Sequence, residues 1–192
     1  MTLANKITLA RIALIPFFIV FACMGGTAWD AIALVLFCLC SVTDFLDGYV
    51  ARKYHQVTDF GKFVDPLADK LLICAAMCVF VDRGYMAGWM VFIILAREFI
   101  ITSLRTIAMG KNRVLAATWT GKVKTCTQIA GIIIIFLCLL FTGEDLSISK
   151  TADVLVQLCG WVMMLMTLYS GYDYLHRNWD LVAEGATKPK IK

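Results

Sequence analysis

The chain has 192 residues, of which 60% are hydrophobic and 17% are charged, and its formal net charge is +4. Its mean hydropathy of +0.78 exceeds that of a soluble domain, in which charged residues are commoner. This composition predicts an all-α integral membrane protein and excludes a large water-soluble domain.

Apolar segments recur along the whole chain, each close to the roughly 20 helical residues that cross the hydrocarbon core. In chain order we expect six transmembrane helices over residues 12–29, 31–50, 65–81, 85–110, 125–143 and 154–172. The first and the last two contain no charged side chain. The other three carry a few charges near an end or along one face, and these charges are candidates for function because charge within a membrane is costly.

Basic residues are distributed unevenly between the two sides of these helices. The N-terminus, the 51–64 and 110–124 connections and the C-terminal tail are rich in Lys and Arg, whereas the opposite loops hold only Arg83 and Lys150 as cations. The positive-inside rule therefore places both termini in the cytoplasm. The net positive charge is explained by this topology and by contact with anionic membrane lipids, so no nucleic-acid partner is expected.

The chain shows no linker or repeat that would divide it. We expect one transmembrane domain over residues 1–180, followed by a short basic cytoplasmic tail over residues 181–192. The expected location is the cell membrane.

Four aspartates cluster where the second apolar segment ends and the third begins: Asp44, Asp47, Asp65 and Asp69. Spacings of three and four residues put each pair on one helical face. Because the connecting loop is short, the two helices must be antiparallel and the four carboxylates meet at one membrane depth. They would repel one another unless cations neutralised them. An all-carboxylate site favours Mg²⁺ or Mn²⁺, and four carboxylates can hold two ions about 3.5–4 Å apart.

The residues between the aspartates suit a phosphate ligand. Gly48 and Gly61 let a large group approach a helix backbone, and Ala51 keeps the first of these faces small. Arg52 supplies a planar cation that matches phosphate oxygens. Salt-bridged helix ends are the alternative interpretation, but they do not explain the glycines.

These eight positions complete the pattern D-x2-D-G-x2-A-R-x8-G-x3-D-x3-D, and the chain thereby resembles the CDP-alcohol phosphatidyltransferases. The resemblance implies transfer of a phospho-alcohol group from a CDP-linked donor to a hydroxyl, with release of CMP. It implies that Asp44, Asp47, Asp65 and Asp69 hold two divalent cations and that Asp69 is also the general base. It also implies a homodimer.

The same resemblance extends to a donor site. Asn5, Thr8 and Arg11 are three residues apart and form a polar helical stripe similar to the N-x2-T-x2-R entry of bacterial phosphatidylglycerophosphate synthases within this family. A helix start with an Arg reaching the interface is the alternative. The implied CDP-binding residues are Asn5, Thr8, Arg11, Asp47, Gly48, Ala51, Arg52 and Gly61.

Further cations could bind the phosphate of an acceptor: Lys62, Arg97, Arg105, Lys122 and Lys124. Charged residues in an apolar helix should face the bundle interior or a wet cavity. Glu98 shares a face with Arg105 and can pair with it, which would leave Arg97 as the freer cation. If the 121–125 turn is helical, Lys122 and Lys124 point to different sides and only one reaches the site. A buried ion pair and simple membrane anchoring remain alternatives.

An acceptor with its own phosphate needs such cations. The Arg97–Arg105 and Gly121–Thr125 segments resemble those of phosphatidylglycerophosphate synthases, which implies CDP-diacylglycerol as donor and glycerol 3-phosphate as acceptor. Inositol phosphate or phosphatidylglycerol as acceptor is the nearest alternative. A divalent-cation transporter and a membrane subunit without catalysis are more distant ones. The acceptor that supports CMP release distinguishes these possibilities.

Overall fold

A computed structural model gives the fold. It describes the backbone of residues 3–53, 59–110, 113, 115–116, 118–142, 150–180 and 183. Within these ranges, the side chains of residues 3–6, 44–53, 59–67 and 69 lie outside the description. The cation site, most of the donor site and Lys62 therefore concern side chains that the structure does not describe.

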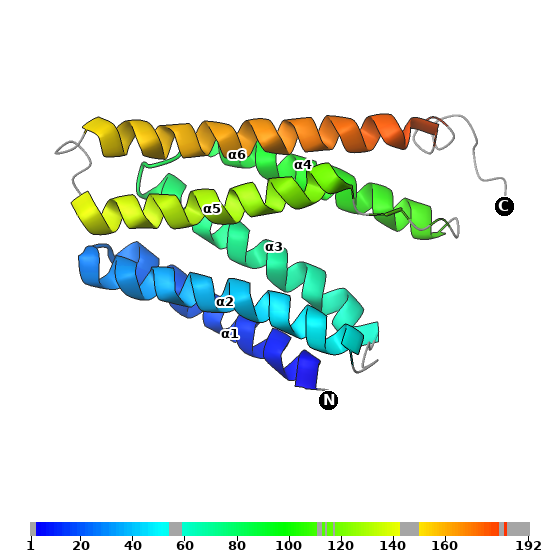
Figure 1. Ribbon diagram of the computed structural model, residues 1–192, viewed down its shortest axis with the longest axis horizontal. Helices are drawn as coiled ribbons and strands as arrows, with labels where there is room; N and C mark the ends of the chain where they lie inside the picture. Colours follow the sequence, from blue (N-terminus) through cyan, green and yellow to red (C-terminus); the bar gives the residue numbers. More distant parts are fainter. Residues whose placement is uncertain are drawn as a thin grey trace.

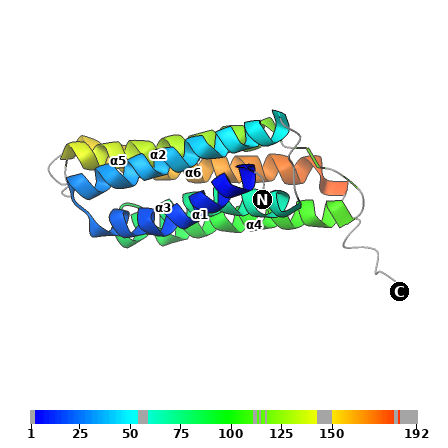
Figure 2. The ribbon, with the colours of Figure 1, turned by 90° about the horizontal axis from the view of Figure 1, so that it is seen from below.

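The described part of the chain is helical, as its composition predicts. It forms six helices: α1 (Leu3–Met24), α2 (Thr27–Lys53), α3 (Asp59–Asp82), α4 (Gly88–Gly110), α5 (Trp119–Thr142) and α6 (Lys150–Arg177). They run roughly along one long axis (Figures 1 and 2).

The boundary between α1 and α2 differs from the prediction. The uncharged run over residues 12–29 suggests one span, but α1 ends at Met24 and the chain turns at Gly25 and Gly26. Their φ angles of 68° and 87° lie in the left-handed region that glycine adopts without steric cost. The prediction was wrong here because absence of charge marks membrane depth and not the position of a turn.

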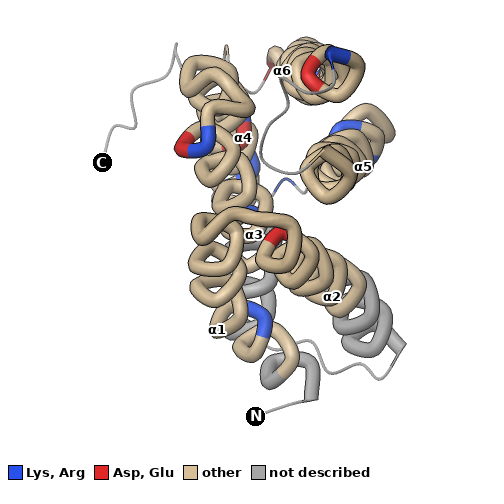
Figure 3. The backbone as a smooth tube through the Cα atoms, turned by 90° about the vertical axis from the view of Figure 1, so that its left-hand side faces the viewer, with Lys and Arg blue, Asp and Glu red and all other residues tan. Residues whose placement is uncertain are grey.

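The helices form two groups of three, seen end-on in Figure 3. Helices α1, α2 and α3 pack together, α6 packs on α4 and α5, and contacts of α2 with α5 and α3 with α4 join the groups. Four fully buried phenylalanines link α1, α2, α3 and α5: Phe18, Phe37, Phe80 and Phe136. Ring centroids are 6.0 Å apart for Phe18–Phe136 and 5.1 Å for Phe80–Phe136. These side chains therefore tie the two groups together in the half of the bundle that holds the turn between α1 and α2.

Many large apolar side chains are exposed on the described helices. Large side chains such as Phe92, Phe99 and Phe141 are 71%, 68% and 87% exposed. Among the described residues, three helices are long and apolar enough to cross a membrane, namely α5, α6 and the Ile7–Met24 part of α1. Charged residues occupy few positions of the tube in Figure 3. These features are those of a membrane protein.

The beginning of α1, the end of α2, the beginning of α3, the end of α4, the beginning of α5 and the end of α6 lie at one end of the bundle (Figure 1). The helix ends that carry the aspartate pattern, and those that adjoin the basic segments of the sequence, therefore lie at one end, hereafter the motif end.

Candidate functional site

The aspartates lie on two neighbouring helices. Asp44 and Asp47 belong to the last turns of α2, and Asp65 and Asp69 to the first half of α3. The two helices contact each other, and only residues 54–58 connect them. The backbone thus agrees with antiparallel helices that bring both halves of the pattern to the motif end.

The chemistry of this donor set fits a hard divalent cation, since all four groups are carboxylates. Among the described side chains, no group of three or more His, Cys, Asp or Glu could hold a metal ion elsewhere. The described part of the molecule therefore offers no second candidate for a metal site.

A cavity of about 490 Å³ opens at the motif end between α3, α4, α5 and α6. It is hereafter the cationic cavity, because five cationic side chains line it: Lys70, Arg97, Arg105, Lys122 and Lys124. Glu98 is the carboxylate in its wall. The volume lies within the range of about 300–1,000 Å³ typical of small-molecule sites. The excess of positive charge suits a phosphate dianion.

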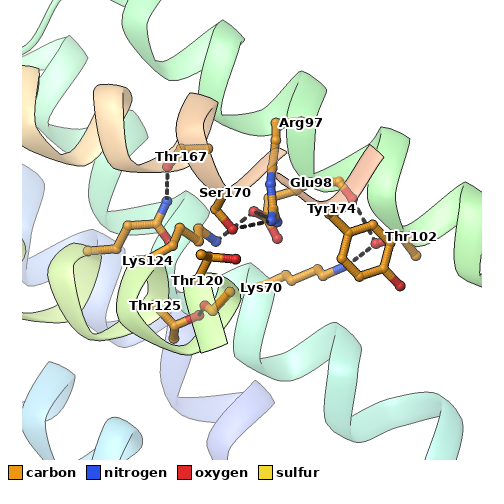
Figure 4. Close-up of polar contacts among 12 residues, drawn as sticks. Lys70, Arg97, Glu98, Thr102, Thr120, Lys124, Thr125, Thr167, Ser170 and Tyr174 are labelled. Atoms are coloured by element: carbon orange, nitrogen blue, oxygen red, sulfur yellow. Dashed lines mark hydrogen bonds and ion pairs between the residues drawn. The ribbon is translucent and has the colours of Figure 1, made fainter. Parts of the chain in front are cut away.

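Glu98 connects two helices in this wall (Figure 4). Its Oε1 accepts hydrogen bonds from Lys124 Nζ of α5 at 2.6 Å and from Arg97 Nη1 at 3.0 Å. The prediction that Glu98 pairs with Arg105 is therefore wrong. Spacing along α4 shows which residues share a face, but it does not show that Lys124 approaches from α5.

Arg105 has an aromatic partner on α6. Its Nε donates to the hydroxyl oxygen of Tyr174 at 3.2 Å, and its guanidinium carbon is 5.5 Å from the ring centroid. Arg105 is therefore directed across the cavity by a buried tyrosine, not by a carboxylate.

Both lysines at the beginning of α5 line the cavity, although Lys124 is buried and Lys122 is exposed. Both therefore reach this cavity, although helical spacing directs them to different sides of α5. The cavity extends around the first turn of α5, where Thr118 Oγ1 accepts a hydrogen bond from Gly121 N at 3.2 Å and caps the helix.

The donor-site residues of α1 are only partly described. Thr8 and Arg11 are each 1% exposed and lie inside the packed helices. Neither lines the cationic cavity. Asn5 lies outside the described side chains.

Three residues of the cavity region were missed in the sequence. Lys70, which follows Asp69, donates to Thr102 Oγ1 of α4 (Figure 4). The sequence does indicate Lys70 as a functional candidate, because it is a cation in an apolar helix. The sequence does not indicate Ser170 and Tyr174 of α6, because neither is charged. Each becomes relevant only through its hydrogen bond with an arginine of α4.

A second cavity, of about 190 Å³, adjoins the first through Lys70, Glu98, Lys124 and Thr125. Its other walls are mostly apolar side chains of α3 and α4, including Leu71, which is 40% exposed. A charged space thus borders directly on an apolar one.

Comparisons with known proteins agree with this chemistry. Residues 1–171 match the CDP-alcohol phosphatidyltransferase family. The chain is 39% identical over 191 residues to a CDP-diacylglycerol--glycerol-3-phosphate 3-phosphatidyltransferase of Bacillus subtilis (strain 168), covering 93% of this chain and 95% of the relative. A protein of the same name from Rickettsia bellii (strain RML369-C) is 36% identical over 90% of this chain and 92% of its own length. A third protein of this name, from Escherichia coli (strain K12), is 40% identical over 131 residues, which cover 66% of this chain and 71% of the relative.

Proposed function

The chain belongs to the CDP-alcohol phosphatidyltransferase family, and we infer that it transfers the phosphatidyl group of CDP-diacylglycerol to a hydroxyl of glycerol 3-phosphate. The products are phosphatidylglycerol phosphate and CMP. Relatives that span nearly the whole chain carry the name of this activity. The observation that carries the acceptor assignment is the cationic cavity, which borders α3, the helix that carries Asp65 and Asp69.

The cavity supports an acceptor that has a phosphate of its own. Arg97 and Lys124 both donate to Glu98 Oε1, so their cationic groups lie close together. Lys70 lines the same cavity from α3, the helix that also carries Asp65 and Asp69. A phosphate held by these cations would leave the glycerol hydroxyl directed towards the aspartates. Phosphatidylglycerol also carries a phosphate, but its two acyl chains would have to stay in the bilayer while its headgroup entered the cavity.

The roles of the aspartates follow from their chemistry and from the family. Asp44, Asp47 and Asp65, together with Asp69, would hold divalent cations, on which members of this family generally depend. When bound, such ions neutralise pyrophosphate and stabilise the leaving phosphate. Asp69 would take the proton of the attacking hydroxyl as general base. The site would hold two such ions, either Mg²⁺ or Mn²⁺.

The donor site of the proposal is the face around Gly48 and Gly61. Both glycines leave room for the nucleotide, and Arg52 would pair with its phosphates. Asn5, Thr8, Arg11, Asp47 and Ala51 would complete the CDP contacts. The buried positions of Thr8 and Arg11 on α1 are compatible with this arrangement.

All six helices would span the cell membrane, with both termini and the active site at the cytoplasmic face, because the loops and termini next to the motif end are richer in Lys and Arg than the opposite loops. Residues 1–180 would be one catalytic domain and residues 181–192 a basic tail. The protein would act as a homodimer.

CMP release tests the proposed activity. Purified protein in detergent receives CDP-diacylglycerol and Mg²⁺ or Mn²⁺, with glycerol 3-phosphate, inositol phosphate or phosphatidylglycerol in parallel. We expect release with glycerol 3-phosphate alone and its loss on chelation by EDTA. Release with a different acceptor would overturn the acceptor assignment, and release that survives chelation would overturn the cation site.

Arg97→Ala tests the assignment of the cationic cavity. We expect the KM for glycerol 3-phosphate to rise roughly tenfold or more, as for loss of a hydrogen bond to a charged group, while the KM for CDP-diacylglycerol stays within about twofold. The matched control is Arg113→Ala, which removes an exposed arginine at the motif end that pairs with Asp180 at 3.0 Å. An unchanged acceptor KM in Arg97→Ala would remove Arg97 from the site.

A further inference from the structure

We propose that Ser170 and Gly171, neighbours on α6, are positioning residues for the acceptor phosphate, because they hold the Arg97 guanidinium at the wall of the cationic cavity. This inference rests on the proposed function of that cavity. Neither residue lines the cavity. Their effect would pass through Arg97 alone.

Ser170 fixes the end of the arginine side chain. It is fully buried, and its Oγ accepts a hydrogen bond from Arg97 Nη2 at 2.8 Å (Figure 4). Arg97 Nη1 donates to Glu98 Oε1 at 3.0 Å. The two terminal nitrogens are thus held by different helices, α6 and α4, which sets the orientation of the guanidinium plane. A planar donor group binds phosphate well only when that plane is correctly oriented.

Gly171 makes room for the stem of the same side chain. A Cβ atom added to Gly171 would lie 2.9 Å from Arg97 Cγ and 3.6 Å from Arg97 Nε. The first distance is shorter than real Cβ contacts, so any larger residue would displace the arginine stem or separate α4 from α6. Arg97 therefore lies directly against the backbone of α6.

Gly160 of the same helix provides a contrast. It is buried, yet the nearest atom to an added Cβ is Met90 Sδ at 3.7 Å, which is an ordinary contact. Close approach of α4 to α6 therefore does not by itself require glycine. At Gly171 the requirement comes from Arg97.

This arrangement has a functional consequence. A free arginine side chain has many rotamers, and fixing it costs side-chain entropy each time a ligand binds. Ser170 and Gly171 would fix the Arg97 conformation during folding, so that phosphate binding would not have to restrict this side chain further. A shift of an ångström in such a group can weaken catalysis strongly.

The experiment measures KM for both substrates in Ser170→Ala and Gly171→Ala, with Gly160→Ala as matched control. We expect the KM for glycerol 3-phosphate to rise about fivefold to tenfold in the first two and to stay unchanged in the control. The KM for CDP-diacylglycerol should be unchanged in all three. Equal changes in both constants would indicate general disturbance of the bundle and would overturn the inference.

A double-mutant cycle separates positioning from packing. In an Arg97→Ala background, Ser170→Ala and Gly171→Ala should have no further effect on the acceptor KM, because the side chain that they position is gone. Additive effects would overturn the proposal. Should Gly171→Ala fail to fold, Ser170→Ala carries the test, since it removes a single oxygen atom.

The proposed function and this inference fail in different ways. If wild-type protein releases no CMP with glycerol 3-phosphate, the proposed function fails, and the inference fails with it. If the wild type is active and Arg97→Ala raises the acceptor KM, but Ser170→Ala does not, the inference alone is wrong.

Discussion

Asp69→Asn is expected to abolish CMP release while weakening the binding of CDP-diacylglycerol less than Asp44→Asn does. Both substitutions remove one carboxylate charge from the aspartate pattern. Asp44 would help to hold the cations that neutralise the donor's pyrophosphate, so its loss should reduce binding and turnover together. Asp69 would in addition accept the proton of the attacking hydroxyl, and the loss of a general base lowers rates by about 10²–10⁴-fold.

Two measurements on each variant check this prediction: CMP release under saturating substrates, and equilibrium binding of CDP-diacylglycerol with Mg²⁺ present. Asp82→Asn, at the opposite end of α3, is the control and should retain activity. If Asp69→Asn and Asp44→Asn lose donor binding equally, the assignment of Asp69 as base is wrong.

Asp30→Ala is expected to cause the largest loss of stability, by removing one partner of a buried ion pair at the end of the bundle opposite the motif end. Arg83, in the turn after α3, bonds to both carboxylate oxygens of Asp30 in α2, with Nη2 to Oδ2 at 3.0 Å. The two side chains are 9% and 1% exposed. Arg83 also donates to the carbonyl oxygen of Ala22 at 3.2 Å, and its guanidinium carbon is 5.1 Å from the ring centroid of Tyr85.

Removal of Asp30 would leave the Arg83 charge buried without its carboxylate, which typically costs about 3–5 kcal/mol. The free energy of unfolding in mixed detergent micelles measures this loss. The exposed pair of Arg113 with Asp180 is the control, and Asp180→Ala should cost less than about 1 kcal/mol. The double variant Asp30→Leu/Arg83→Leu should recover most of the stability. A loss in Asp30→Ala no larger than that in the control would contradict the prediction.

Several features follow from sequence because they depend on local composition or spacing. Long apolar runs require helices in a membrane, where each backbone polar group needs a partner within its own segment. The aspartate pattern has a fixed spacing across one short connection, so the sequence is sufficient to indicate the family. The match over residues 1–171 confirms it. Cations in an apolar helix marked Arg97 and Arg105 as residues of a polar cavity, and both line it.

The partners of these residues could not be read in the same way, because they come from helices far away in the chain. Glu98 shares a face with Arg105, yet the packing of α5 brings Lys124 to it instead. Ser170 and Tyr174 look like ordinary residues of an apolar helix until α6 lies against α4, where they accept hydrogen bonds from Arg97 and from Arg105. Periodicity along one helix specifies a face, whereas the packing of helices specifies what that face meets.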